Sequence, residues 1–237
     1  MKKLIIIAMA ILSAISCTER EDELVTVKFG YSNFERGKLT KVEQEPTIDD
    51  LILSSLPTEF PLDLYDKMNN IHISAEIGKE VSIPVGEYTI RGRNEIAPSN
   101  SINVISEVPQ MSIYETVKIS KDINQYNLKA KFKCFAIVVD FNEISKVDVD
   151  GADIQFKRNG RYGIVYVNKF EKDFTVNVYP KDDMYNKKRS FFFSSKNVNG
   201  YVYCQEGYYY IIHPKIVDLF GTSFSIEYDS LKGKDLK

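Results

Sequence analysis

The feature that most constrains this fold is a series of short segments in which apolar and polar residues alternate. Leu24–Phe29 and Ile71–Ile77 alternate residue by residue, and Ser112–Ile119 is a further segment of strand type. Successive side chains of a β-strand point to opposite faces of the sheet, so a period of two predicts strands with one buried face. Many such segments with few helical patterns predict an all-β chain built from β-sandwiches.

Two segments predict where particular strands lie in a sheet. Val81–Ile90 contains Pro84 and Gly86, and we expect two strand arms that meet at a bend there. Proline cannot donate to the hydrogen-bond ladder, so this region should lie at a sheet edge or in a bulge. Lys131–Phe141 is apolar on both faces at its centre, which predicts a central position in a sandwich.

Turn residues between strand-like segments predict three hairpins. Asp150-Gly151 and Asn159-Gly160 are dipeptides that favour type I′ turns. Gln205-Glu206-Gly207 separates Tyr201–Cys204 from Tyr208–Ile212, which predicts the third hairpin.

Helical patterns are scarce, and two short helices are expected. Thr47–Ser54 begins with a capping threonine that is followed by aspartates in the first turn, where negative charge is favourable. Pro214–Phe220 begins with a proline and is stopped by Gly221.

A polar interval at Lys121–Gln125 divides the strand pattern into two groups. We expect one domain over residues 24–122 and a second over residues 123–237, each near the usual size of a domain. Both are predicted to be β-sandwiches of the transthyretin-like or immunoglobulin-like kind.

The first sixteen residues have the organisation of a secretory signal peptide. A basic start at Lys2 and Lys3 is followed by the uncharged run Leu4–Leu12, which is too short to span a bilayer. Small residues then lead to Cys17 and resemble the lipobox of bacterial lipoproteins, although Ala14 stands where leucine is usual. We therefore expect residues 1–16 to be removed and Cys17 to be lipidated. An ordinary signal peptide followed by a chance cysteine is the alternative.

Residues 17–23 are expected to form an acylated tether. A diacylglycerol on Cys17 and a further acyl chain such as palmitate on its amine would supply the two or more chains that stable anchoring needs. Thr18–Glu23 is too charged to enter a core. In some Gram-negative lipoproteins such an acidic cluster accompanies export, so this resemblance implies the outer membrane and the cell surface.

The charge balance gives no sign of a nucleic-acid partner. The chain has 31 Lys and Arg against 33 Asp and Glu, for a net charge of −2. The basic tail Lys232–Lys237 is more typical of a frayed end than of a binding site. We expect neither nucleic acid nor a cofactor.

Cys134 and Cys204 remain in the exported chain, where a disulfide between them is allowed. We expect two free, buried thiols, and a disulfide is the alternative. Cys134 shares a strand face with Phe132, Ala136 and Val138, so it should point into the core of the carboxy-terminal domain.

Motifs for catalysis and metal binding are weak. Asp148–Asp153 has three carboxylates near a glycine, but its spacing differs from that of a calcium loop, and a hairpin turn explains the same residues. His72 and His213 have no second ligand at a zinc spacing, and the serines lack the common nucleophile motifs. A pair of catalytic carboxylates, as in a glycoside hydrolase, remains an alternative, because the two members come together in space rather than in sequence. We expect no enzymatic activity.

The tyrosine content is the most unusual feature of the composition. There are 15 tyrosines and no tryptophan, and five tyrosines lie between residues 201 and 210. An exposed row of them could stack on sugars or anchor a protein partner. The alternative is packing against cross-strand neighbours. We select Tyr201, Tyr203, Tyr208 and Tyr210 as possible contacts, with solvent exposure as the deciding property.

The lipobox, the two groups of strands and the segment Ile77–Gly92, IGKEVSIPVGEYTIRG, resemble the fimbrillin-like lipoproteins of Gram-negative anaerobes. In that family a Pro-x-Gly-x-Tyr segment, here Pro84–Tyr88, lies in the amino-terminal domain. The resemblance implies a cell-surface subunit for adhesion or fimbrium assembly, joined to a neighbour by strand donation. A surface glycan-binding lipoprotein is the alternative function.

The same resemblance raises the question of proteolysis. In stalk-forming fimbrillins an arginine-specific protease removes the first strand and opens a groove for the next subunit. Here cleavage after Arg20 would leave Leu24–Gly30 in place, whereas cleavage after Arg36 would remove it. An anchor must keep its lipid, so we expect the uncut form and an anchor or accessory role.

Overall fold

Strands dominate the part of the chain that the structure describes. The computed structural model describes residues 23–32, 47–94, 103–142, 144–150, 156–181, 188–218 and 221–231. Within these ranges α2 (Ile48–Ser55) is the single α-helix, and the predicted all-β class is confirmed. No helix of these ranges is both long and apolar enough to cross a bilayer.

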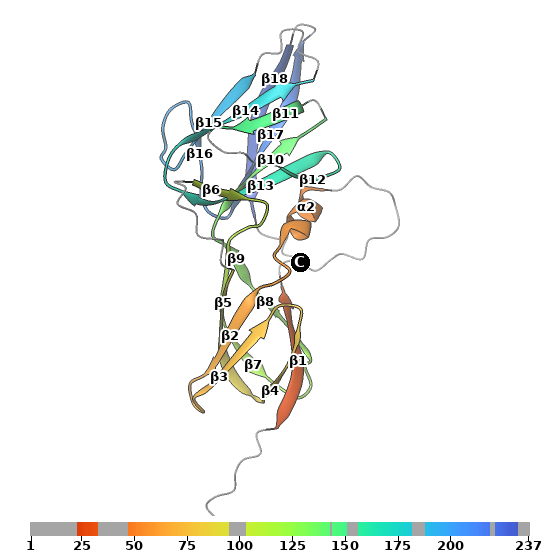
Figure 1. The fold of residues 1–237 in the computed structure, drawn as a ribbon, viewed down its shortest axis with the longest axis vertical. Coiled ribbons are helices and arrows are strands. Elements are labelled where there is room, and N and C mark those ends of the chain that lie inside the picture. The colour runs from red at the N-terminus through yellow and green to blue at the C-terminus, as the bar shows by residue number, and fades with distance from the viewer. Residues whose placement is uncertain are drawn as a thin grey trace, which may run out of the picture.

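Two sheets form the amino-terminal lobe, which lies at the lower end of the molecule in Figure 1. Its strands are β1 (Leu24–Tyr31), β2 (Pro61–Asp66), β3 (Ile71–Glu76), β4 (Glu80–Pro84), β5 (Gly86–Arg93), β7 (Met111–Ile119), β8 (Gln125–Leu128) and β9 (Ala130–Phe132). The smaller sheet has the order β4-β1-β8, with β1 antiparallel to β4 and parallel to β8. The larger sheet has the order β3-β2-β5-β7-β9 and is antiparallel throughout.

Two further sheets form the carboxy-terminal lobe, at the upper end in Figure 1. Their strands are β6 (Asn103–Ser106), β10 (Phe135–Asp140), β11 (Ile144–Val149), β12 (Lys157–Asn159), β13 (Tyr162–Phe170), β14 (Phe174–Pro180), β15 (Arg189–Ser194), β16 (Val202–Tyr203), β17 (Tyr208–Asp218) and β18 (Gly221–Ser230). One sheet has the order β12-β13-β10-β17-β18, with β6 also paired to β13. The other has the order β11-β14-β15-β16.

Strand β10 is buried along its whole length, as its apolar sequence predicts. It lies between β13 and β17. Phe135, Ile137 and Val139 point into the core between the two sheets of the carboxy-terminal lobe. Ala136 and Val138 point the other way, into a cluster that they share with the core of the amino-terminal lobe.

Helix α2 contributes to the apolar cluster that both lobes share. Its Leu51 and Ile52 are buried in the shared cluster, and the helix packs against β12 and β13. The predicted cap is confirmed: Thr47 Oγ1 accepts a hydrogen bond from the Asp50 main-chain nitrogen, and Asp50 accepts one from the Thr47 main-chain nitrogen. α2 therefore packs on the carboxy-terminal lobe, within an apolar cluster that contains residues of both lobes.

Segments cross over between the lobes near the predicted domain boundary. β6 precedes residue 122 but pairs with β13, whereas β8 and β9 follow it and pair with β1 and β7. The division at residues 122 and 123 stays a prediction.

Most predicted strands are found with bounds close to those expected. The bend at Val85 separates β4 from β5, and Pro84 ends β4 at an edge of the smaller sheet, as predicted. The hairpin at Asn159-Gly160 is also found, because Asn159 pairs with Tyr162. Its two loop residues are Gly160 and Arg161, and of these Gly160 alone has a positive φ, +61°. A positive φ at the first loop residue alone is the pattern of a type II′ turn rather than the predicted type I′.

The hairpin predicted at Asp150-Gly151 falls largely on residues 151–155, which lie outside the described residues. The described strands on either side of them, β11 and β12, lie in different sheets. The hairpin predicted at Gln205–Gly207 is wrong. β16 pairs in parallel with β15, whereas β17 pairs with β10 and β18, so Gln205–Gly207 carries the chain from one sheet to the other. Turn residues fix the local chain reversal but not the strand that becomes the partner.

The predicted helix over Pro214–Phe220 is also wrong. Residues 208–218 form the single strand β17, in which Pro214 is paired opposite Phe224 of β18. His213 therefore lies within a strand. Pairing of β17 to β10 ends at Ile212, so among the described strands a proline at position 214 interrupts no ladder on that side.

Cys134 and Cys204 are both free and both buried. Cys134 does share its face with Phe132, Ala136 and Val138. The prediction that it points into the core of the carboxy-terminal domain is wrong. It packs in the cluster shared between the lobes, whereas Cys204 packs between the two sheets of the carboxy-terminal lobe.

Candidate functional site

The first candidate site is the open flank of β1. β1 pairs with β4 through residues 24–28 and with β8 through residues 28–31. The main-chain nitrogens of Lys28 and Ser32 donate to the oxygens of Asn124 and Leu128, so even-numbered residues of β1 turn their polar groups toward β8. Polar groups alternate along a strand, so Thr26 also turns its N–H and C=O toward this flank. β8 begins opposite Lys28, so it does not extend to the position beside Thr26.

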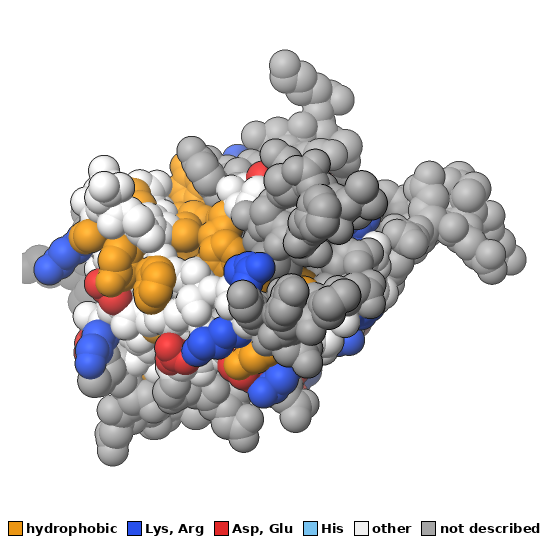
Figure 2. Space-filling model, turned by 90° about the horizontal axis from the view of Figure 1, so that it is seen from above, with side chains coloured by type: hydrophobic (Ala, Val, Ile, Leu, Met, Phe, Trp, Pro, Cys, Tyr) orange, Lys and Arg blue, Asp and Glu red, His pale blue; other side chains and the backbone are white. Residues whose placement is uncertain are grey.

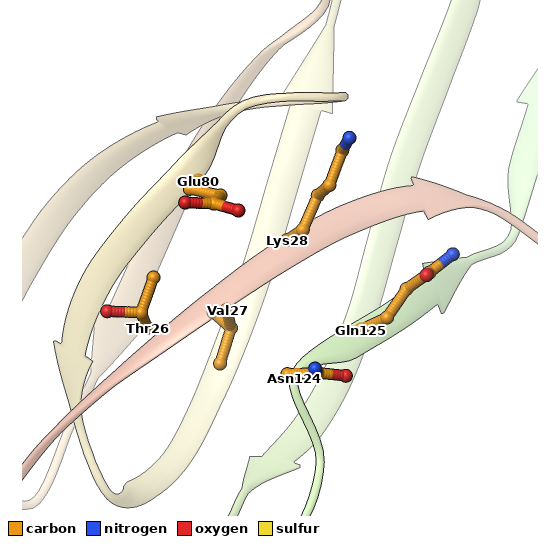
Figure 3. A pocket seen from close by; sticks show the side chains of 6 residues that line it. All are labelled: Thr26, Val27, Lys28, Glu80, Asn124 and Gln125. Carbon is orange, nitrogen blue, oxygen red and sulfur yellow. The ribbon is translucent and has the colours of Figure 1, made fainter.

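A cavity of about 340 Å³ lies at this flank. Figure 3 shows β1 and the start of β8 diverging on either side of it. Polar side chains dominate its lining, which consists of Thr26, Val27, Lys28, Glu80, Asn124 and Gln125. The arrangement offers main-chain and side-chain hydrogen-bonding groups to an extended segment.

An ion pair lies across the same flank. Glu23, the residue before β1, contacts the ammonium of Lys121 in the turn before β8. Both side chains are more than half exposed, so this pair contributes little to stability. It joins the start of β1 to the turn that precedes β8.

The four selected tyrosines do not form one exposed row. Tyr201 and Tyr203 are 39% and 43% exposed, whereas Tyr210 is 3% exposed and Tyr208 is half-buried. The hydroxyl of Tyr210 donates to the Tyr203 oxygen and accepts from the Gln205 nitrogen. Tyr210 therefore positions the main chain around β16 and is unavailable for stacking on a ligand.

A second candidate site is the outer face of the β15–β16 pair. Phe192, which sequence reasoning missed, is 43% exposed, and its ring centroid lies 5.4 Å from that of Tyr201. Phe193 points inward at 0% exposure, so alternation along β15 turns Phe192 outward. The signal was present in the sequence as the run Phe191-Phe192-Phe193, but its faces could not be assigned before β15 was placed. The exposed aromatic patch consists of Phe192, Tyr201 and Tyr203.

A polar network lies on the same face of that sheet. Asn177 of β14 donates to Asp150 Oδ1 at 2.7 Å and accepts from the Ser190 hydroxyl at 2.7 Å. Thr175 of β14 pairs opposite Phe192, and Asn177 pairs opposite Ser190. The hydroxyls of Thr175 and Ser190 and the amide of Asn177 therefore lie on β14 and β15 near the aromatic patch, and the Asp150 carboxylate lies beyond β14, at the end of β11.

Among the described residues of the carboxy-terminal lobe, the most buried charge is Asp140, at 0% exposure. Its Oδ2 accepts from Nε of Arg161 at 2.8 Å, its Oδ1 accepts from the Asn142 nitrogen, and His213 Nδ1 lies 3.8 Å away. Burial opposes ionisation, but hydrogen bonds and the charges of Arg161 and His213 outweigh it and lower the pKa of Asp140. The carboxylate is fully partnered, which is the arrangement of a structural ion pair.

The other residues selected from sequence have separate places. His72 lies in β3, 3.3 Å from Asp63. Asp148 pairs with Lys146, and Asp153 is outside the described residues. Cys17, Arg20, Arg36 and the basic tail are also outside them. Across the ranges that the structure describes, no group of three or more His, Cys, Asp or Glu side chains could hold a metal ion.

No family model and no curated protein matches the chain. Solved structures match the chain at TM-scores below 0.5 and at low identity. The "putative cell adhesion protein" of Bacteroides uniformis has a TM-score of 0.43 at 9% identity, over 90% of this chain and 100% of that one. The tip fimbrial protein Mfa3 of Porphyromonas gingivalis, with a C-terminal truncation, has 0.40 at 9%, over 87% and 98%. The fimbrial anchor protein Mfa2 of the same organism has 0.28 at 11%, over 89% and 98%.

Proposed function

We propose that this chain is a non-catalytic, fimbrillin-like cell-surface subunit that serves in adhesion or as an anchor or accessory subunit of a pilus. The solved structures above are named as cell adhesion, fimbrial tip and fimbrial anchor proteins. The observation that carries the proposal is the position of β1. β1 is the middle strand of the sheet β4-β1-β8, so its loss would leave two unpaired strands with a groove between them. An extended segment of a neighbour could fill such a groove by main-chain hydrogen bonds.

A retained β1 sets the role of the subunit. With β1 in place the groove is filled by the chain's own strand, and the open flank at Thr26 is the part left for a partner. Such a subunit accepts at most one donor strand and does not polymerise as a stalk subunit does. An anchor or accessory subunit has these properties.

The proposal places the chain at the outer membrane through a lipid on Cys17. Residues 17–23 lead directly into β1, which begins at the lower end of the molecule in Figure 1. The carboxy-terminal lobe lies at the opposite end and would face away from the membrane. A diacylglycerol and an amide-linked palmitate would make this attachment stable.

Amino-terminal sequencing and mass spectrometry of the membrane fraction test the proposal. We expect an acylated Cys17 at the terminus and a body in one piece. Cys17→Ala should leave the protein unprocessed or remove it from the membrane fraction, whereas Ser16→Ala keeps a small residue before the cysteine and should be processed normally. A native terminus at Gly37, or a ladder of heat-labile multimers, would identify a stalk subunit instead.

Glycan binding is a second candidate function. One observation favours it: Tyr201 and Tyr203 are exposed on the carboxy-terminal lobe together with Phe192. The test is calorimetric titration of the protein with soluble oligosaccharides.

A further inference from the structure

We propose that the outer face of β14, β15 and β16 is a binding site for a neutral saccharide chain, with Phe192 and Tyr201 as the stacking floor. This inference rests on the second candidate function above and names its site and ligand class. In Figure 2, which looks down on the carboxy-terminal lobe, hydrophobic side chains gather at the left, the side on which Figure 1 places β15 and β16.

The aromatic patch is built by the register of the strands. Phe193 pairs with Val202, so the preceding residues Phe192 and Tyr201 lie side by side on the outer face. Tyr203 lies one step further on the same face. Ring faces carry partial negative charge, and the C–H groups of a sugar ring pack on them much as other apolar groups do.

The polar groups beside the patch determine the class of ligand. Thr175 lies opposite Phe192, and the Ser190 hydroxyl lies two residues along the same strand. Asn177 is 3% exposed and holds Ser190 and Asp150 in fixed positions from β14. Hydroxyl groups of a saccharide both donate and accept, and these side chains offer both functions.

A protein partner is less well matched to this face. The centre of a protein interface is depleted of lysine, acidic residues and serine and is closely packed. Here the rings adjoin a hydroxyl of Thr175 and the exposed loop Ser195–Gly200, in which Lys196 is the one charged residue. β16 has two paired residues, too few to serve as the acceptor of a donated strand. The small apolar area and the hydroxyl groups of Thr175 and Ser190 beside the rings together favour a neutral saccharide over a peptide.

The test is titration of the full-length protein, kept in a sugar-free detergent, with maltoheptaose, cellohexaose, xylohexaose and mannohexaose. Calorimetry should detect binding of at least one, and heparin should not compete. Phe192→Ala and Tyr201→Ala should each weaken that binding by about tenfold, while Tyr201→Phe keeps the ring and should bind within about twofold.

Tyr114→Ala is the matched control, because Tyr114 is 71% exposed on the amino-terminal lobe. Its affinity should equal that of the wild type. Absence of binding to all four oligosaccharides at millimolar concentration, or unchanged affinity of the Phe192→Ala and Tyr201→Ala variants, would overturn the inference. Either result would leave the lipid on Cys17 and the retained β1 untouched, since these are measured by amino-terminal sequencing of the same preparation.

Discussion

The hydroxyl of Tyr210 donates a hydrogen bond of 2.9 Å to the main-chain oxygen of Tyr203, across the crossover from β16 to β17. The same hydroxyl accepts from the main-chain nitrogen of Gln205 at 2.9 Å. One buried side chain thus satisfies two main-chain groups where the chain passes between sheets, as the tyrosine corner of other sandwiches does. The bonds fix the backbone that carries the exposed ring of Tyr203.

Tyr210→Phe removes both bonds without creating a cavity. We expect the free energy of unfolding to fall by about 1–3 kcal/mol, because the Tyr203 carbonyl and the Gln205 amide lose their partner. Urea denaturation followed by circular dichroism measures this. Tyr114→Phe alters an exposed tyrosine and should leave stability unchanged, and an equal loss in both variants would contradict the assigned role of Tyr210.

Local chemistry made some elements predictable from sequence, and non-local pairing hid the rest. The cap of α2 is formed by Thr47 and Asp50, which are three residues apart in the sequence. The apolar residues on both faces of β10 predict its central position in the sheet. The helix expected at Pro214 is a strand because β18 supplies a partner along its length. Phe192 became visible only when β15 was placed, since its exposure depends on which face β14 and β16 leave open.

Alkaline pH should destabilise the protein. Burial raises the pKa of Cys134 and of Tyr210 to about 12, and it raises the pKa of Cys204, Tyr31 and Tyr166 as well. The unfolded chain loses these protons from about pH 8.5 for cysteine and about pH 10 for tyrosine. Between those values and the folded pKa the native state binds more protons, so stability is full below about pH 8.5 and falls as pH rises.

The expected slope is at most about 1.4 kcal/mol per pH unit for each such group. Urea denaturation at a series of pH values from neutral to strongly alkaline measures it. Tyr166→Phe removes one of the groups and should flatten the slope above the pKa of free tyrosine. A slope that is the same in this variant and in Tyr114→Phe would show that Tyr166 does not contribute.

Arg161→Met should destabilise the protein by about 2–4 kcal/mol at neutral pH, because it removes the guanidinium that donates to the buried carboxylate of Asp140. The wild-type pKa of Asp140 is lowered, so the contribution of the pair is present above the unfolded pKa of about 3.9 and is lost as pH falls through the folded pKa. The difference between variant and wild type should therefore shrink in acid. Adding Asp140→Asn to the variant should restore part of the loss, and a loss that is unaffected by pH would contradict the ion-pair account.

Gly92→Ala should disrupt the core of the amino-terminal lobe. A Cβ at this position would lie 2.6 Å from Phe60 and 2.8 Å from both Leu62 and the Pro61 carbonyl oxygen, which cannot all move. We expect a loss of about 1–3 kcal/mol. Gly30→Ala is the matched control, because its Cβ would meet the side-chain tip of Asn127, which can rotate away. Thermal unfolding of the two variants measures the difference, and similar midpoints would contradict it.

The last prediction concerns the open flank of β1. If even-numbered residues face β8, the Thr26 amide has none of the described strands beside it on that flank, whereas the Val27 amide faces β4 and pairs with Val81. Thr26 should therefore exchange its amide hydrogen at least about tenfold faster than Val27. Hydrogen exchange followed by nuclear magnetic resonance resolves the two residues. Val25, which has the same parity as Val27, is the internal control and should also be protected. Equal protection of Thr26 and Val27 would mean that the flank is already covered, and the strand-donation site proposed there would have to be abandoned.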